Sequence, residues 1–464
     1  MRSLLKVVPV LAALGAAALC PGFSQANGRF PAAQLVQLSP DGQTIALRLT
    51  FGFALSDDGG QNFRWICEDV LGYGAGAFDP SFVLDASRRL FVGAPDGLAR
   101  LETNRCEHAR VAELDRAFVI DLDRSTDGQT LVAITSSGAP GAQNRIWRSN
   151  DSGAQWSPLG AGVGPETLFE TVELARSNSQ RVYATAVRNN PRSVRFFRSD
   201  DGGATLADFS LDAFALDDAF IAAVDPSNAD VIYVRGRLSA PPPPDAGAGA
   251  SPTALLVSRD GGRTFNELAR TVGAMNGFAI SDDGQSLWIG STHSADGLQR
   301  STDRGATWSR VNDARVTGLR FHNGTLWVAA NWVIDRFALG RSVDGGRTIT
   351  PALGTFCDLR GAPVCPPSSD VTAVCGARWS VYRSAPLGCP PAVDDDASAP
   401  MLDAATPRSD AAVEPPAAAP GCRCAAPSRS SRSPRALTVV SFALSAIALA
   451  RRARRAQRAP ERCD

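Results

Sequence analysis

A serine, an aspartate two positions later and a glycine two positions after that recur six times along the 464-residue chain. A hydroxyl and a carboxylate at this spacing can hydrogen-bond the backbone N–H groups of a tight turn or contribute ligands to a calcium ion. One carboxylate per turn makes a poor calcium site, so the pattern predicts a structural turn and no metal. The residues are Ser56, Asp58 and Gly60; Ser149, Asp151 and Gly153; Ser199, Asp201 and Gly203; Ser258, Asp260 and Gly262; Ser301, Asp303 and Gly305; and Ser342, Asp344 and Gly346.

The spacing of these copies indicates a repeat protein. A degenerate copy within residues 97–108 lines up with residues 297–308, and counting it from Leu101 gives intervals of 45, 48, 50, 59, 43 and 41 residues. Upstream of the motif, the units carry two apolar runs joined by a turn such as Asp-Gly or Asn-Gly, which is typical of a hairpin. Four antiparallel strands in each of seven units predict an all-β, seven-bladed β-propeller over residues 27–352.

The repeated octapeptide resembles the Asp-box, or BNR repeat, of sialidases, Vps10-type receptors, some xyloglucan hydrolases and photosystem II assembly factors. The resemblance covers residues 29–352 and implies a propeller in which the motif occupies the turn between the third and fourth strands of a blade. The glycine there is expected to take a positive φ. The resemblance implies a fold more than a function, because one fold serves many functions.

Propeller geometry places the loops between second and third strands on the face opposite these turns. Polar and aromatic residues in those loops are the candidates for a ligand surface. They are Arg192, His293, Asp296, Trp332, Asp335 and Arg336.

A sialidase-like enzyme would need an arginine triad, a tyrosine nucleophile with a glutamate partner, and an acid/base aspartate. Arg29 stands close to the expected mature N-terminus, and Tyr183 and Tyr233 occupy equivalent strand positions, which favours packing. No catalytic residue, cofactor or metal is therefore assigned. We expect a noncatalytic propeller that binds a protein or a glycan through its loop face. The alternatives are a secreted glycoside hydrolase and an assembly or chaperone-like factor for exported proteins.

Six cysteines in the body predict three disulfides in an exported chain, and the absence of any CxxC pair argues against zinc. Topology predicts a Cys67–Cys106 bridge between adjacent blades, and close spacing predicts two local loops in the Cys-rich segment 353–390. Residues 371–384 of that segment are expected to supply a closing strand or an incomplete extra blade. The six cysteines are Cys67, Cys106, Cys357, Cys365, Cys375 and Cys389.

The two ends of the chain predict export. Residues 1–26 have the basic, apolar and small-residue regions of a signal peptide, with a lipoprotein Cys20 as the alternative. Residues 391–420 are a Pro-, Ala- and Asp-rich linker, expected to be disordered. Residues 421–464 contain Cys422 and Cys424, an apolar run at 436–450 and clustered arginines.

The terminal segment resembles the C-terminal sorting tag of myxobacterial surface proteins, which implies a short transmembrane helix at 436–450 and anchoring at the cell surface. Across the chain, 47 basic and 47 acidic residues balance, which gives no argument for a nucleic-acid partner. We expect a monomer.

Overall fold

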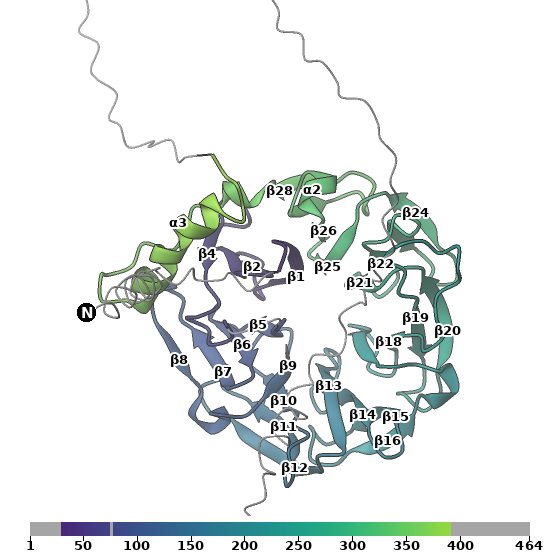
Figure 1. Ribbon diagram of the computed structural model, residues 1–464. Helices are drawn as coiled ribbons and strands as arrows, with labels where there is room; N and C mark the ends of the chain where they lie inside the picture. Colours follow the sequence, from purple (N-terminus) through teal and green to yellow (C-terminus); the bar gives the residue numbers. More distant parts are fainter. Residues whose placement is uncertain (1–28, 75–77, 391–464) are drawn as a thin grey trace, which may run out of the picture. The chain divides into compact units, whose positions relative to one another are not determined.

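The computed structural model describes residues 29–74 and 78–390. It confirms the all-β, seven-bladed propeller: seven four-stranded antiparallel sheets are arranged in a ring (Figure 1). The predicted signal peptide, the linker and the terminal segment with its 436–450 run lie outside the described residues. Within residues 29–74 and 78–390, no helix is long and apolar enough to cross a membrane.

Each blade consists of four strands that are consecutive in the sequence, so the ring closes without exchanging a strand between its ends. Blade 1 comprises β1 (Ala33–Leu38), β2 (Ile45–Leu49), β3 (Gly52–Ser56) and β4 (Arg64–Ile66); blade 2 comprises β5 (Phe82–Leu84), β6 (Leu90–Ala94), β7 (Gly97–Leu101) and β8 (His108–Arg110); blade 3 comprises β9 (Val119–Arg124), β10 (Leu131–Thr135), β11 (Asn144–Ser149) and β12 (Ser157–Val163).

The remaining blades follow the same plan. Blade 4 comprises β13 (Thr167–Leu174), β14 (Val182–Arg188), β15 (Ser193–Ser199) and β16 (Ala207–Ser210); blade 5 comprises β17 (Phe220–Val224), β18 (Ile232–Arg237), β19 (Thr253–Ser258) and β20 (Asn266–Thr271); blade 6 comprises β21 (Met275–Ile280), β22 (Leu287–Ser291), β23 (Leu298–Ser301) and β24 (Ser309–Asn312); blade 7 comprises β25 (Val316–His322), β26 (Thr325–Ala330), β27 (Leu339–Ser342) and β28 (Thr350–Leu353). Short helices are η1 (Ala112–Leu114), η2 (Asp212–Phe214) and α2 (Trp332–Asp335).

The repeated octapeptide lies in the turn between the third and fourth strands of its blade. In blade 5, the Ser258 hydroxyl donates to Asp260 Oδ1 at 2.8 Å and accepts from the Gly262 N–H at 2.8 Å. Gly262 has φ +85°, and a Cβ atom built on it would lie 2.1 Å from the Phe196 ring of the preceding blade. The glycine is therefore required both for the turn and for the close approach of two blades.

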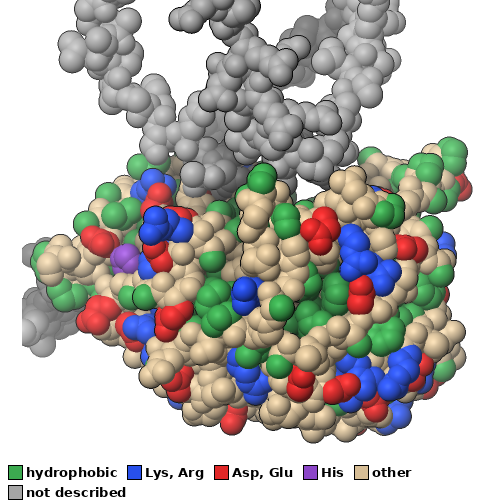
Figure 2. Space-filling view, turned by 90° about the horizontal axis from the view of Figure 1, so that it is seen from below, with side chains coloured by type: hydrophobic (Ala, Val, Ile, Leu, Met, Phe, Trp, Pro, Cys, Tyr) green, Lys and Arg blue, Asp and Glu red, His purple; other side chains and the backbone are tan. Residues whose placement is uncertain are grey.

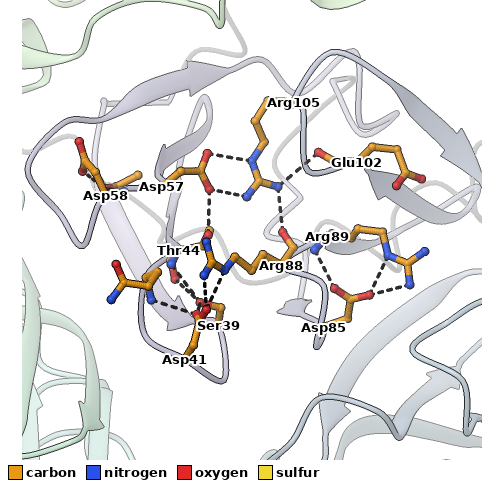
Figure 3. Close-up of polar contacts among 12 residues, drawn as sticks. Ser39, Asp41, Thr44, Asp57, Asp58, Asp85, Arg88, Arg89, Glu102 and Arg105 are labelled. Atoms are coloured by element: carbon orange, nitrogen blue, oxygen red, sulfur yellow. Dashed lines mark hydrogen bonds and ion pairs between the residues drawn. The ribbon is translucent and has the colours of Figure 1, made fainter.

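The degenerate copy in blade 2 uses Asn104 Oδ1 as the acceptor for two backbone N–H groups of its turn, and it also contacts blade 1 (Figure 3). Arg105, buried and with φ +59°, reaches into the first intact motif and contacts Asp57 through Nη2 at 2.6 Å and Nε at 3.1 Å. Asp57 also accepts from the Thr44 hydroxyl at 2.8 Å. Because the carboxylate serves groups from two blades, it links blade 2 to blade 1.

The three disulfides form, but not with the predicted partners. The bridges are Cys67–Cys375, Cys106–Cys365 and Cys357–Cys389, so the expected Cys67–Cys106 bridge and the two local loops were wrong. Cys67 and Cys106 do lie on adjacent blades, but each meets a cysteine of the Cys-rich segment, which crosses the rim there. We call residues 354–390 the cap.

The cap is helical where a closing strand or an extra blade was expected. η4 (Val371–Gly376) runs into α3 (Ala377–Ser384), which lies outside β4 at the rim (Figure 1). Val371, Cys375, Trp379 and Tyr382 follow one another at spacings of four, four and three, and all pack against the core of blade 1. This is a helical period, and the segment is helical although it also contains β-branched residues.

The cap joins the two ends of the ring. It continues from the last strand of blade 7 through η3 (Phe356–Asp358) and then runs beside β4. The Trp65 N–H donates to Gly361 O at 2.7 Å, and the Arg360 N–H donates to Phe63 O at 3.0 Å. With bridges to blades 1 and 2, the cap closes the seam between the first and last blades.

Candidate functional site

A polar cavity of about 740 Å³ lies among the innermost strands of the ring. Irregular pairing in the first strands shapes it, because the register shifts once in six of the seven, in β1, β9, β13, β17, β21 and β25. A residue skipped by such a shift is released from the regular alternation of the strand. The skipped residues Glu170, Asn276 and Thr317 all line the cavity, which we call the funnel.

Two arginines enter the funnel from the loop-face ends of second strands, Arg48 from β2 and Arg235 from β18. Arg48 donates to Gln34 Oε1 at 2.9 Å and to Pro80 O at 2.8 Å, and Arg235 donates to Met275 O. Among the described residues, neither has a carboxylate within ion-pair distance. Burial lowers the pKa of Arg235 to about 10; the negative charge of Asp218 opposes this shift, and the positive charge of Arg48 contributes to it.

The aspartates of the funnel are bound to neighbouring backbone or to an arginine. Asp121 Oδ2 accepts from the Val172 N–H at 2.9 Å, and Asp123 Oδ2 accepts from the Leu174 N–H at 2.8 Å, so both carboxylates join blade 3 to blade 4. Burial raises the pKa of Asp121 to about 7. Asp79 is paired with both terminal nitrogens of Arg29, at 2.7 and 2.9 Å.

The two glutamates of β13 differ in their surroundings. Burial and the adjacent Asp123 carboxyl raise the pKa of Glu173 well above its usual range. Burial, followed by the charge of Asp218, raises the pKa of Glu170 to about 8. Glu170 Oε2 is buried and, among the described residues, has no hydrogen-bond partner. Glu170 therefore holds a proton at neutral pH.

The opposite end of the funnel holds a third arginine. Arg320, near the end of β25, has its pKa lowered to about 9 by burial and then by Arg176 and Arg124. Glu173 and Asp123 oppose this shift. The funnel thus contains arginines at both ends and carboxyl groups on one side. The side of the disc in Figure 2, by contrast, intersperses basic and acidic side chains.

The residues proposed from sequence lie on the loops of blades 4, 6 and 7, away from the funnel lining. Exposed Arg192 donates to Asp217 O. Half-buried His293 accepts from the Ala295 N–H through Nδ1 at 3.2 Å. Buried Asp296 accepts from Ser291 Oγ at 2.6 Å and from two backbone N–H groups.

The blade 7 candidates belong to the helix α2. Trp332 Nε1 donates to Pro31 O at 2.8 Å, and its ring stacks on Phe30, so it packs across the seam of the ring. Asp335 Oδ2 accepts from the Arg315 and Asn331 N–H groups at 3.1 and 3.2 Å. Arg336 is exposed at the end of this helix, with φ +66°. Three of the candidates predicted from sequence thus make contacts that support the fold. They are Trp332, Asp335 and Asp296.

The sequence analysis missed the funnel residues, although one signal was present. Asp121 and Asp123 alternate with apolar residues in an inner strand. An inner strand that only packs against its neighbours would be expected to carry uncharged residues at these positions. Irregular strand pairing brings three further residues to the funnel, and no local sequence pattern predicts this irregularity. They are Glu170, Asn276 and Thr317.

No protein-family model matches this chain, and no curated protein matches it. Among solved structures, an ancestral GH74 enzyme aligns at 14% identity and a TM-score of 0.52, covering 69% of this chain and 46% of the enzyme. This chain therefore spans about half of that enzyme. The GH74 xyloglucanase from Xanthomonas campestris aligns at 14% identity with a TM-score of 0.28, over 68% of this chain and 72% of the other. Hydrazine synthase from Kuenenia stuttgartiensis aligns at 12% identity with a TM-score of 0.47, over 68% and 96%. At these identities the likeness concerns the fold.

Proposed function

We propose that this chain is an exported, noncatalytic propeller that binds a glycan in its central funnel. The observation that carries the proposal is the funnel itself, whose volume of about 740 Å³ falls within the range of ~300–1,000 Å³ found for small-ligand sites. The three disulfides are consistent with an oxidising compartment outside the cytoplasm. Surface anchoring through residues 421–464 is part of the proposal and rests on the sequence alone.

The lining of the funnel suits a sugar. Phe220 and Phe278 offer apolar ring surface, while Asn276, Thr317 and Glu170 offer polar atoms nearby. The Thr317 hydroxyl, like Glu170 Oε2, is buried without a hydrogen-bond partner among the described residues. Buried polar atoms are normally paired, so a ligand with hydroxyl groups would satisfy both. The GH74 enzymes of similar fold are glycoside hydrolases, which agrees with a glycan ligand.

The state of the carboxyl groups argues for binding without cleavage. A glycosidase of the usual kind needs two carboxyl groups on either side of the scissile bond, one as acid and one as base or nucleophile. In the funnel, Asp79 is paired with an arginine, and Asp121 and Asp123 accept backbone hydrogen bonds. Glu173 shares its environment with Asp123, which leaves Glu170 as a single available acid.

A glycoside hydrolase is the second candidate, favoured by one observation. Glu170 keeps its proton up to about pH 8 beside a large cavity, as a general acid would. This function would also need a general base. Asp121 is the best candidate for that role, because its pKa of about 7 allows it to accept a proton.

The experiment that separates the two candidates uses the purified full-length protein with its disulfides intact. A glycan array and a panel of chromogenic glycosides are tested in parallel. We expect binding without turnover. Turnover that is lost in Glu170→Gln would contradict the noncatalytic proposal and make the chain a hydrolase. Silence in both assays would contradict glycan binding altogether.

A further inference from the structure

The loop-face end of the funnel contains two arginines that, among the described residues, have no carboxylate within ion-pair distance. The carboxylates that act on them from a distance are each paired with another arginine: Asp79 with Arg29, and Asp218, whose Oδ2 lies 3.0 Å from Arg237 Nη2. Arg48 and Arg235 therefore face the funnel with hydrogen-bond donors to spare, since the contacts of Arg235 within the described residues comprise one carbonyl and the face of the Phe220 ring.

The residues between these arginines add neutral polar groups. Asn276 is exposed in the funnel, and Thr317 lies beside it on the next inner strand. The two arginines stand on blades 1 and 5, so a group between them would be contacted from opposite sides of the ring. A guanidinium binds carboxylate, sulfate or phosphate oxygens through paired N–H groups, which is the strongest polar contact available to a side chain.

We propose that the ligand of the funnel is an acidic glycan whose anionic group, a carboxylate or a sulfate, binds between Arg48 and Arg235. This inference deepens the proposed function and rests on it. Glu170 supports the assignment, because as a neutral acid it donates a hydrogen bond and adds no negative charge at neutral pH. The remaining acid near Arg48, Asp121, has an oxygen committed to the backbone of blade 4.

The test begins with the glycan array, sorted into neutral, carboxylated and sulfated members. The best ligand is then titrated by calorimetry, alongside its carboxyl-reduced or desulfated form, which keeps the sugar skeleton and removes the charge. We expect the neutral form to bind at least about 10-fold more weakly, because a hydrogen bond between charged groups contributes ~1.5–3 kcal/mol. The affinity should also fall as salt is raised.

Two funnel variants and one control locate the charge. Arg235→Gln is expected to weaken binding of the acidic glycan about 10- to 100-fold, and Arg48→Gln, on the opposite side, gives a second and independent reading. Arg341→Gln removes the same charge from an exposed position on β27 and should change the affinity less than about twofold. Unchanged thermal unfolding of each variant establishes that the fold is retained.

The outcomes distinguish this inference from the function on which it rests. Selective binding of acidic glycans, weakened in the two funnel variants and not in the control, supports both. Binding of neutral glycans alone, or no effect of either funnel variant, overturns the anion site and leaves glycan binding in place. No binding of any glycan overturns both.

Discussion

Replacing Cys106 and Cys365 with serine tests how the ring is closed. This bridge ties the cap, which continues from blade 7, to the degenerate turn of blade 2. Both cysteines are partly exposed, so serine introduces little buried polarity there. The second bridge, Cys67–Cys375, remains and still holds the cap on blade 1.

The expected loss in the free energy of unfolding follows from the lengths of the loops that the two bridges close. Their sequence separations, 308 and 259, differ by 49 residues, so removing one bridge while the other remains releases a loop of 49 residues. The chain-entropy model gives about 4 kcal/mol for such a loop. Removing the Cys67–Cys375 bridge as well opens the long loop of 308 residues and costs a further ~5.7 kcal/mol. Removing both bridges therefore lowers the free energy of unfolding by more than twice the amount expected for removing Cys106–Cys365 alone.

The assay is equilibrium unfolding in guanidinium chloride, followed by tryptophan fluorescence, with hydrogen exchange to locate the change. In C106S/C365S we expect faster exchange in β7 and β8, which lose their tie to the cap. In the control C357S/C389S, whose bridge lies within the cap, exchange in β7 and β8 should stay as in the wild type. A loss below about 1 kcal/mol in C106S/C365S would refute the assignment of ring closure to the cap.

Three further predictions concern the turns and the funnel. Ser258→Ala leaves the buried Gly262 N–H unpaired and should lower the free energy of unfolding by about 1–3 kcal/mol, measured by denaturation. Gly262→Ala combines a positive φ with a clash against Phe196 and should cost more than Ser258→Ala in the same assay. The folded state retains the proton of Glu170 up to about pH 8, while the unfolded chain releases it near pH 4.5, so stability should fall as pH rises between these values. Glu170→Gln should flatten that fall, and an identical pH profile would contradict the raised pKa.

The overall fold could be predicted from the sequence because its signals are local and repeated. Each octapeptide specifies a turn through its own side chains, and the hairpin turns between apolar runs specify the strands on either side. Even the degenerate copy could be recognised, because the count and spacing of the others demanded a unit there. Its turn keeps a local side-chain acceptor, Asn104 Oδ1, whereas the added Arg105–Asp57 contact involves another blade and could not be read from the local sequence.

The disulfide partners and the funnel could not be predicted for the same physical reason. Pairing depends on where the cap crosses the rim, which is set by packing of Val371, Cys375 and Tyr382 against blade 1. The helical spacing of these residues is visible in the sequence, but the sequence analysis expected a closing strand or an incomplete extra blade there. The candidate ligand residues were sought in loops, whereas the funnel is formed by inner strands whose irregular pairing turns Glu170 and Asn276 inward.

The most direct test of the central claim, that the ligand lies in the funnel, is to fill the funnel and measure binding. Asn276→Trp places a large ring at an exposed position of the lining, and Ile334→Ala, on exposed α2, is the matched change on the loop face. Calorimetric titration with the best array glycan should show at least about a 10-fold loss of affinity in Asn276→Trp and none in Ile334→Ala. Wild-type affinity in Asn276→Trp would contradict the account and move the site to the loops.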